Sequence, residues 1–410
     1  MTIKCGLLGG KLGHSYSPEI HAHLGDYPYL LHEKKPEEIE DFLRNGDFTG
    51  LNVTVPYKKT VIPYCSVLSP AAKALGAVNT IVRQPDGTLW GHNTDYFGFQ
   101  AMLTKSDLSV RGKKVLVLGS GGASNTVVAV LKSQGAQVVV ISRTGENNYE
   151  NLHLHADASA IVNTTPVGMF PHNENAPLSL YTFPHLEGVL DLIYNPAKTQ
   201  LLMEAEKRGL VALNGLYMLV AQAKESAEYF TGKIIESSII DHIHQALRRQ
   251  MENIILIGMP GCGKSTVGSI LAEKTGRQLV DADAEIVKKA GCTIPEIFET
   301  QGESAFRELE TQVLEELGKQ SGLIIATGGG CVTQERNYSL LHQNGRIFCL
   351  NRDISALATN GRPLSQDGQL EKMYSVRRPM YIRFADHQIN NNGAVESAAM
   401  EILHIWEGIE

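Results

Sequence analysis

The stretch GMPGCGKST, residues 258–266 of this 410-residue chain, constrains the fold more than any other. It matches the phosphate-binding loop (P-loop) pattern of a glycine, four residues, a second glycine, a lysine and a serine. Residues 253–257, NIILI, predict a short buried strand before the loop, and residues 266–274 predict a helix after it. A chance glycine-rich turn is the alternative, and the agreement of the loop with both flanking elements disfavours it.

The chemistry of such a loop assigns its residues to a nucleotide and a Mg²⁺ ion. Glycines let backbone N–H groups turn toward a phosphate at the positive end of a helix. Lys264 adds a point charge, and Ser265 offers a hydroxyl to Mg²⁺. Cys262 lies inside the loop, where neighbouring N–H dipoles favour a thiolate, so we expect its oxidation to be inhibitory. The predicted nucleotide-binding residues are Gly261, Cys262, Gly263, Lys264, Ser265 and Thr266.

A P-loop usually follows the first strand of its own domain, so a new domain starts near residue 252. The length allows about two to three domains. A net charge of −7 and a pI near 6.1 disfavour a general nucleic-acid surface. The chain has no long apolar run, its N-terminus MTIKCGLLGG does not resemble a signal peptide, and its six cysteines include no CxxC pair. We therefore expect a cytoplasmic protein with reduced thiols and no nucleic-acid or membrane partner.

A second nucleotide motif lies in residues 111–144, which predict a strand, a glycine turn, a helix and another strand. This βαβ unit carries a dinucleotide fingerprint at its first turn, with Ser124 in place of the last Gly or Ala. An NAD site calls for an acid after the second strand to bind the ribose 2′-hydroxyl. This chain has Ser142, Arg143 and Thr144 there, which favours the 2′-phosphate of NADP; a plain surface charge at Arg143 is the alternative. The turn residues assigned to NADP are Gly119, Ser120, Gly121, Gly122 and Ala123.

Polar residues near the ends of predicted elements mark a further site in residues 1–105. Ser15 and Ser17 precede Pro18, where small hydroxyls cap a helix or hold a carboxylate beside free N–H groups. Lys58 follows a strand and is a candidate functional ammonium or a solvated charge. Asp95 precedes a helix and is a candidate functional carboxylate or its N-cap.

The second half has its own polar residues around predicted strands. Asp281 and Asp283 lie at the end of one strand, and Arg307 lies one turn into a helix. Residues 328–330 are three glycines after another strand, where backbone can approach a ligand. Residues 360–368 are rich in turn formers and predict a mobile lid.

Short motifs in family order give the chain a likeness to two enzyme families. Residues 253–410 resemble shikimate kinase through the P-loop, DAD (281–283), GESAFR (302–307), GGG (328–330), RPL (362–364) and RRPMY (377–381). Residues 1–250 resemble shikimate dehydrogenase through HSYSP (14–18), NVTVPYK (52–58), GAVNT (76–80), NTD (93–95), GSGGAS (119–124), SRT (142–144), NTTPVGM (163–169), YNP (194–196) and GLYMLVAQA (215–223).

The resemblance to shikimate dehydrogenase implies NADPH-dependent reduction of 3-dehydroshikimate to shikimate. By this likeness Lys58 and Asp95 are the catalytic pair, and Ser15 and Ser17 bind the substrate carboxylate. The further residues that it implies are Thr54, Asn79, Tyr194 and Gln222 for the substrate, and Leu192 and Gly215 for NADP.

The resemblance to shikimate kinase implies ATP- and Mg²⁺-dependent phosphorylation of shikimate to shikimate 3-phosphate. Lys264 would contact the transferred phosphate, with Ser265 and Asp281 on the Mg²⁺ side, and Asp283 would orient the 3-hydroxyl. The remaining roles fall to Arg307 and Arg377 for the substrate carboxylate, Gly328, Gly329 and Gly330 for backbone contacts to the substrate, and Arg362 of the lid for the nucleotide.

The predicted fold class is α/β. An α/β substrate-binding domain covers residues 1–105 with helices returning over 220–250, a Rossmann-like NADP domain covers 106–219, and a P-loop kinase domain with a parallel sheet covers 253–410, with its lid near 355–368. The alternatives are a protein with one inactive, regulatory or scaffolding half, and a broader quinate/shikimate dehydrogenase fused to the kinase. The oligomeric state and the channelling of shikimate stay open.

The chain departs from the family patterns at a few positions. Lys11 stands where proline is common, and Ala22 replaces an expected asparagine. Gly145 and Glu146 replace a basic residue after the NADP-selecting arginine, which weakens the expectation of NADP. Arg383 stands where the kinase family commonly has an acid, although no predicted ligand is affected.

Overall fold

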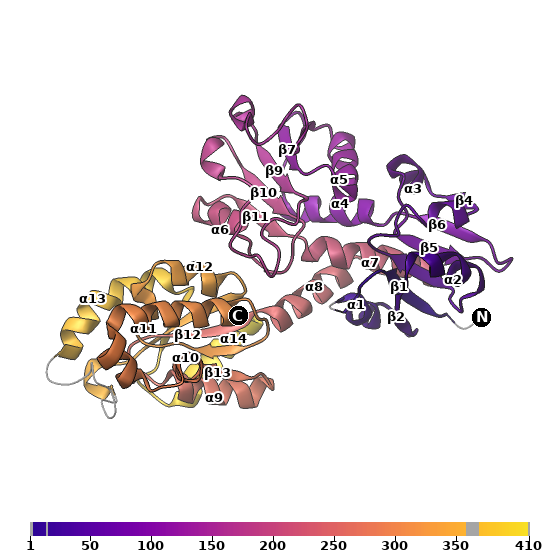
Figure 1. Cartoon of the computed structure of the whole chain (residues 1–410). Coiled ribbons are helices and arrows are strands. Elements are labelled where there is room, and N and C mark those ends of the chain that lie inside the picture. Colours follow the sequence, from indigo (N-terminus) through magenta and orange to yellow (C-terminus); the bar gives the residue numbers. More distant parts are fainter. Residues whose placement is uncertain (1–2, 14, 358–368, 409–410) are drawn as a thin grey trace. The chain divides into compact units, whose positions relative to one another are not determined.

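The computed structural model describes residues 3–13, 15–357 and 369–408 (Figure 1). Within these residues no helix is both long and apolar enough to span a membrane. The chain divides into two compact units. The first consists of Met1–Gly168, Asn175–Tyr194 and Leu201–Ala246, and the second of Met169–Glu174, Asn195–Gln200 and Leu247–Glu410.

The first sheet of unit 1 has the strand order β2-β1-β3-β5-β6-β4. Strands β1 and β3 are buried along their whole length and pair in parallel, whereas β3 pairs with β5 antiparallel. Helix α7 packs against β3, β5 and α4, and Gly98 allows the close approach of α4, because a Cβ there would lie 2.8 Å from the carbonyl oxygen of Met218. The strands are β1 (Cys5–Gly9), β2 (Tyr29–Glu33), β3 (Gly50–Val53), β4 (Val67–Leu68), β5 (Thr80–Arg83) and β6 (Leu89–His92), and the helices of this part are α1 (Ser17–Leu24), α2 (Ile39–Asn45), α3 (Pro70–Leu75), α4 (Asp95–Ser106), α7 (Leu216–Thr231) and α8 (Ser238–Met251).

The second sheet of unit 1 has the order β11-β10-β9-β7-β8, and all of its pairings are parallel. Figure 1 shows α5 and α6 on opposite sides of this sheet. The predicted βαβ unit is therefore present, with a buried apolar core on the strands. The elements are β7 (Lys114–Leu118), α5 (Gly122–Ser133), β8 (Gln137–Ile141), β9 (Ala160–Asn163), β10 (Gly188–Asp191), α6 (Gln200–Lys207) and β11 (Val211–Asn214).

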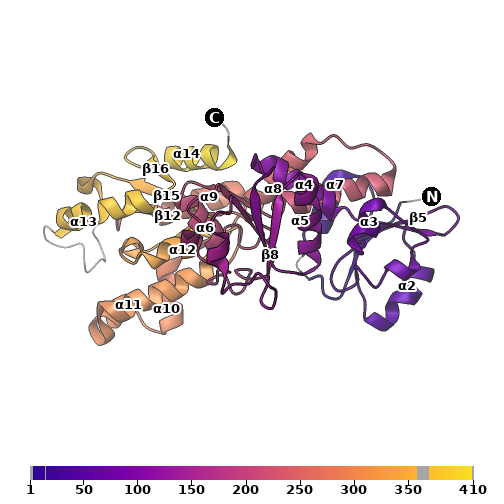
Figure 2. The ribbon, with the colours of Figure 1, turned by 90° about the horizontal axis from the view of Figure 1, so that it is seen from above.

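Unit 2 is built on a parallel sheet of order β13-β14-β12-β15-β16. Figure 2 shows α9 and α14, which pack against each other, on one side of these strands and α11 and α12 on the other. The predicted α/β fold class is confirmed in both units. The elements are β12 (Asn253–Ile257), α9 (Lys264–Thr275), β13 (Leu279–Asp281), α10 (Ala282–Ala290), α11 (Ile294–Gly318), β14 (Ile324–Ala326), α12 (Arg336–His342), β15 (Gly345–Asn351), α13 (Gln369–Phe384), β16 (His387–Asn390) and α14 (Val395–Glu407).

Some element boundaries differ from those predicted, and glycines explain two of the differences. The sequence GAVNTIV predicts a strand over residues 76–82, but β5 begins only at Thr80, because Gly76 ends α3 with a left-handed φ of 59°. The helix after the P-loop begins at Lys264 rather than at residue 266, because Gly263 occupies the N-cap with a φ of 97°. The sequence GESAFRELE predicts a helix that begins at residue 302. In the structure helix α11 begins earlier, at Ile294, and passes through Gly302, whose backbone angles are not helical.

Candidate active sites

The candidate catalytic pair of unit 1 is assembled in the structure. Lys58 follows β3, and Asp95 is the first residue of α4. The Lys58 Nζ donates to Asp95 Oδ2 at 2.6 Å, and the two side chains remain 32% and 19% exposed, so a ligand can reach them. Thr94, not Asp95, is the N-cap residue of α4, so the alternative role of Asp95 as the cap does not hold.

A buried polar network lies behind this pair. Asn79 Oδ1 accepts the backbone N–H of Thr94 at 2.7 Å, and Asn79 Nδ2 donates to the Thr94 hydroxyl at 3.1 Å. The Ser226 hydroxyl on α7 lies 3.0 Å from both the Thr94 and Thr80 hydroxyls and accepts from Asn52 Nδ2 at 2.7 Å. The network thus ties the residue before Asp95 to α7, which also carries the predicted Gln222, whose Oε1 lies 3.4 Å from the Thr94 hydroxyl.

The predicted carboxylate-binding residues lie at the start of α1. The Ser15 Oγ accepts the backbone N–H of Ser17 at 3.2 Å, and the Ser17 side chain is mostly buried. The ring of Tyr16, between these serines, meets Tyr194 edge-on at 6.1 Å between centroids. Burial, with a smaller contribution from Tyr16, raises the pKa of Tyr194, so its hydroxyl stays a donor at neutral pH. The structure therefore brings Tyr194 to this serine segment, while Thr54 lies just past β3.

The glycine turn of the βαβ unit leaves room for a dinucleotide. Gly119 has a φ of 100°, and a Cβ there would lie 2.9 Å from Thr164 Oγ1, so the loop approaches the end of β9 closely. A Cβ at Gly121 or Gly122 would meet nothing within 4 Å, which leaves the outer side of the loop open. The N-cap residue of α5 is Gly121, which has no side chain, so no N-cap side chain accepts a hydrogen bond from the N–H groups of the first turn. These features fit a pyrophosphate at the helix N-terminus.

The other residues assigned to NADP lie at the ends of neighbouring strands. Ser142 follows β8, and Arg143 and Thr144 are exposed beyond it. Gly215 packs directly on Leu192, because a Cβ at Gly215 would lie 2.1 Å from the Leu192 carbonyl oxygen. No larger residue fits at this position without a shift of the backbone.

In unit 2 the P-loop lysine is held by its own loop. The Lys264 Nζ donates to the carbonyl oxygens of Gly258 at 2.9 Å and of Met259 at 3.1 Å. Asn391 Nδ2, next to the end of β16, donates to the Cys262 carbonyl oxygen at 2.7 Å and so fixes the middle of the loop. The Cys262 side chain is fully buried, so the expected oxidation of this thiol requires the loop to open.

The predicted metal ligands are adjacent. The Ser265 hydroxyl donates to Asp281 Oδ2 at 2.8 Å, while Asp281 Oδ1 accepts the backbone N–H of Asp283 at 3.0 Å. The part of the chain that the structure describes contains no cluster of three or more His, Cys, Asp or Glu side chains able to hold a metal. A hydroxyl with one carboxylate fits Mg²⁺, which takes few protein ligands and completes its shell with water and phosphate.

The predicted acceptor residues converge on the glycines after β14. Arg377 Nη1 donates to the Gly329 carbonyl oxygen at 3.1 Å. A Cβ at Gly330 would lie 2.2 Å from Arg307 Nη1, and one at Gly328 would lie 2.7 Å from Asp283 Oδ1. All three predicted side chains therefore surround one short loop. The predicted lid residues 358–368, including Arg362, lie outside the described residues.

Two residues that contact this region, Glu310 and Tyr381, were not predicted from the sequence. Glu310 is 1% exposed, and its Oε2 accepts from Arg307 Nη1 at 2.8 Å. Burial raises the pKa of the Glu310 carboxyl, although Arg307 beside it acts in the opposite direction. Arg307 and Glu310 are three residues apart on a predicted helix, and this spacing could have predicted their ion pair. Tyr381, whose hydroxyl also donates to the Gly329 carbonyl oxygen, gave no such signal beyond its place one turn after Arg377.

Two protein-family models match the chain, one within each of its two compact units. Residues 260–407 match the model "Shikimate kinase", and residues 7–81 match the model "Shikimate dehydrogenase substrate binding domain". A shikimate dehydrogenase (NADP(+)) of Clostridium perfringens strain SM101 is 35% identical over 265 residues, covering 59% of this chain and 97% of the relative. One of Shouchella clausii is 38% identical over 260 residues, covering 57% of this chain and 94% of the relative.

Solved structures give the same result for the first unit. A chorismate mutase/shikimate 5-dehydrogenase fusion protein of Clostridium acetobutylicum has a TM-score of 0.57 and 35% identity, covering 60% of this chain and 97% of the other. The Thermus thermophilus shikimate 5-dehydrogenase in complex with NADP(H) and shikimate has a TM-score of 0.54 and 29% identity, covering 60% and 99%. A quinate dehydrogenase of Corynebacterium glutamicum in complex with NAD has a TM-score of 0.55 and 27% identity, covering 60% and 99%.

Proposed function

Because the chain belongs to the shikimate dehydrogenase family and continues into a shikimate kinase domain, we propose that it catalyses two consecutive reactions. The first is the NADPH-dependent reduction of 3-dehydroshikimate to shikimate, and the second is the ATP-dependent phosphorylation of shikimate to shikimate 3-phosphate. The observation that carries the proposal is that each half holds an assembled set of reactive groups: Lys58 with Asp95, and Lys264 with Ser265 and Asp281.

In the first reaction the Lys58–Asp95 pair supplies the proton that the ketone oxygen takes up. The dinucleotide, when bound, supplies the hydride. Asp95 orients the Lys58 ammonium at 2.6 Å, and this ammonium donates a proton to the oxygen that becomes negative as the ketone is reduced. Ser15 and Ser17 hold the substrate carboxylate through hydroxyl and backbone donors, and Tyr194, next to this segment, contributes a further polar contact to the substrate. Thr54, Asn79 and Gln222 contact the rest of the substrate.

The dinucleotide site supports NADP through the open glycine turn and the residues after β8. Gly121 and Gly122 leave space for the pyrophosphate. Arg143, exposed beyond the strand, pairs with the 2′-phosphate, with Ser142 and Thr144 as hydroxyl donors.

In the second reaction the residues position the substrates and neutralise charge. Lys264 would leave the two loop carbonyl oxygens to contact the transferred phosphate, and Ser265 and Asp281 would hold Mg²⁺, which would neutralise phosphate charge. Asp283 accepts from shikimate hydroxyls and orients the 3-hydroxyl. The substrate carboxylate binds Arg307 and Arg377, which already converge on residues 328–330. Arg362 of the lid completes the nucleotide site.

Two other functions are kept as competing outcomes. A broader dehydrogenase that also accepts quinate is favoured by the likeness to a quinate dehydrogenase in complex with NAD. A protein with one inactive half would act in regulation or scaffolding, but both halves retain their predicted reactive residues. We place the protein in the cytoplasm, with 3-dehydroshikimate and shikimate as its small-molecule partners.

A coupled assay with the full chain tests the proposal. The chain is given 3-dehydroshikimate with NADPH or with NADH, and dinucleotide oxidation is followed; ATP and Mg²⁺ are then added and phosphate transfer to the product is measured. We expect oxidation with a strong preference for NADPH, followed by formation of shikimate 3-phosphate. Equal use of the two dinucleotides would refute the NADP assignment, and failure of either step would favour an inactive half. In a separate assay in the oxidative direction, turnover of quinate as well as shikimate would favour the broader enzyme.

A further inference from the structure

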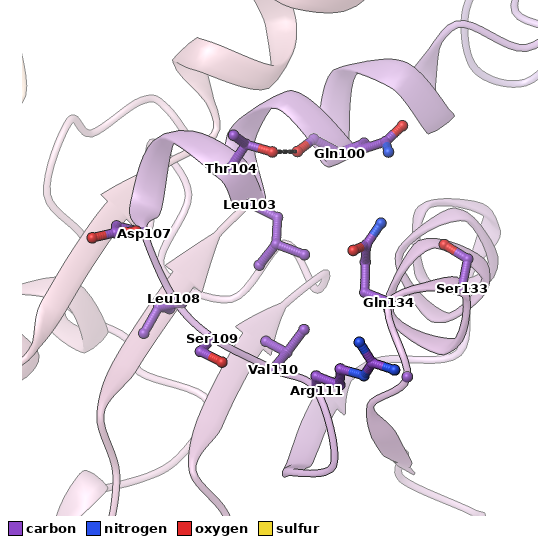
Figure 3. Close-up of a pocket in the computed structure, with 11 residues that line it drawn as sticks. Gln100, Leu103, Thr104, Asp107, Leu108, Ser109, Val110, Arg111, Ser133 and Gln134 are labelled. Carbon is purple, nitrogen blue, oxygen red and sulfur yellow. Dashed lines mark hydrogen bonds between the residues drawn. The ribbon is translucent and has the colours of Figure 1, made fainter.

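A pocket of about 570 Å³ lies in unit 1 and is lined by no residue assigned to either reaction (Figure 3). Such a volume is typical of small-molecule sites. Its walls come from the second half of α4, from the linker that follows this helix, and from the end of α5. The pocket therefore lies where the chain passes from the first sheet of unit 1 to the second.

Hydrogen bonds hold these walls in place. The linker leaves α4 at Asp107, which has a left-handed φ of 55°. Further on, the Gly112 N–H donates to the Gly135 carbonyl oxygen at 2.9 Å, which fastens the linker to the turn after α5. This bond brings Arg111 of the linker to the same end of the pocket as Gln134, the C-cap residue of α5.

The lining side chains divide into an apolar and a polar part. Leu103 and Val110, each 6% exposed, form the apolar part together with the partly buried Leu108. Figure 3 shows the Arg111 guanidinium near Gln134, with the Gln100 amide across the pocket and Asp107 pointing away from them. Arg111 carries the one positive charge among the lining residues. A guanidinium beside amide donors suits a carboxylate, and the leucine and valine suit an apolar body attached to it.

The pocket is connected to the catalytic pair through α4. This helix begins with Asp95, and its next residue, Tyr96, donates its hydroxyl to the Ser133 hydroxyl at 3.0 Å. Ser133 lies at the end of α5 and lines the pocket. A ligand that bridges Leu103 and Arg111 to Gln134 would fix α4, and with it Asp95, against α5, and would oppose any movement of Asp95 relative to the second sheet.

We propose that this pocket is an inhibitory site for a small organic carboxylate with an apolar body, which slows the dehydrogenase reaction by holding α4 against α5. The site is distinct from the predicted shikimate site. Binding of the carboxylate does not depend on the proposed function. Inhibition rests on the proposed function, because it is measured as a change in the dehydrogenase rate.

The probe for binding is 3-phenylpropanoate, titrated into the full chain by calorimetry. Two control compounds are used: 3-phenylpropanamide, which lacks the charge, and acetate, which lacks the apolar body. We expect saturable binding only for 3-phenylpropanoate, which has both. Arg111→Gln should weaken this binding about tenfold or more, since it removes a charge-assisted contact. Gln134→Glu should weaken it as well by placing a negative charge in the pocket. Lys132→Gln is the matched control, because Lys132 is exposed on α5 but does not line the pocket.

The rate of shikimate oxidation with NADP gives the second measurement. We expect 3-phenylpropanoate to lower turnover in the wild type and in Lys132→Gln, and to lose this effect in Arg111→Gln. Absence of saturable binding, equal binding by the Arg111→Gln variant, displacement of the probe by shikimate, or binding without any change in rate would each overturn the proposal. If the chain had no dehydrogenase activity at all, the proposed function would fail, while calorimetry would still decide whether the site exists.

Discussion

The two candidate sites hold their reactive lysines in different ways. Lys58 is paired with the side chain of Asp95, from an element 37 residues away in the sequence, and both groups are backed by a buried network of hydroxyls and amides. Lys264 is held by two carbonyl oxygens of its own loop, within six residues. The first arrangement depends on side chains brought together by the fold, whereas the second depends on backbone shaped by glycines.

This difference bears on how each site responds to substitution. A site held by side chains loses both charge and orientation when one partner is removed. A site held by backbone carbonyls keeps its shape when a side chain changes but depends on the conformation of the loop. The following substitutions test this contrast in order of decreasing expected effect.

Lys58→Ala should lower dehydrogenase turnover by about 10²–10⁴, because it removes the proton donor to the developing oxyanion. The kinase rate of the same preparation should stay unchanged, and retained binding of NADP reports that the dehydrogenase half is folded. Lys59→Ala is the matched control, since its side chain is exposed. Near-normal turnover of Lys58→Ala would remove the side-chain pair from the mechanism.

Lys264→Met should lower the rate of phosphate transfer by about 10²–10³ through loss of a charge at the transferred phosphate, and should leave shikimate oxidation unaffected. Lys274→Met on the same helix is the control, because this lysine is exposed. A matching loss in the dehydrogenase reaction would mean that the two sites do not act independently.

Glu310→Gln should raise the KM of the kinase for shikimate about tenfold with a smaller change in kcat, because Arg307 loses the buried charge that orients it. Glu308→Gln is the control on the same helix, since Glu308 pairs with Arg336 at the surface. An unchanged KM would show that the backbone around residues 328–330, not the ion pair, fixes the arginine.

Ser226→Ala should cost about 1 kcal/mol or more in the free energy of unfolding, because a fully buried hydroxyl that contacts Asn52, Thr80 and Thr94 is lost. Urea denaturation followed by loss of dehydrogenase activity measures this, with the exposed Ser237→Ala as control. A stability equal to that of the control would mean that the remaining groups satisfy one another without Ser226.

The sequence was sufficient for features that are local. The P-loop strand, residues 253–257, and the first strand of the βαβ unit, residues 114–118, coincide with β12 and β7, because short apolar runs bounded by glycine turns have few alternatives. The α/β class followed from repeated units of this kind. The pairing of Ser265 with Asp281 was implied by the resemblance to shikimate kinase, and the structure shows their contact at 2.8 Å.

Contacts between distant segments could not be predicted in the same way. Nothing in the local pattern around Ser226 indicates that its hydroxyl meets Thr80 and Thr94, 146 and 132 residues away. The anchoring of the P-loop by Asn391, 129 residues downstream of Cys262, is similar. These contacts depend on how helices and loops pack over a finished sheet, which periodicity alone does not determine.

Gly329 joins the two substrate regions of the kinase half. Its carbonyl oxygen accepts from Arg377 and Tyr381, and a Cβ on its other side would lie 2.6 Å from the ring of Pro260 in the P-loop. A movement of this loop when the acceptor binds is therefore passed directly to the nucleotide site. Since such coupling is reciprocal, we expect nucleotide to tighten or weaken acceptor binding by the same factor by which acceptor changes nucleotide binding.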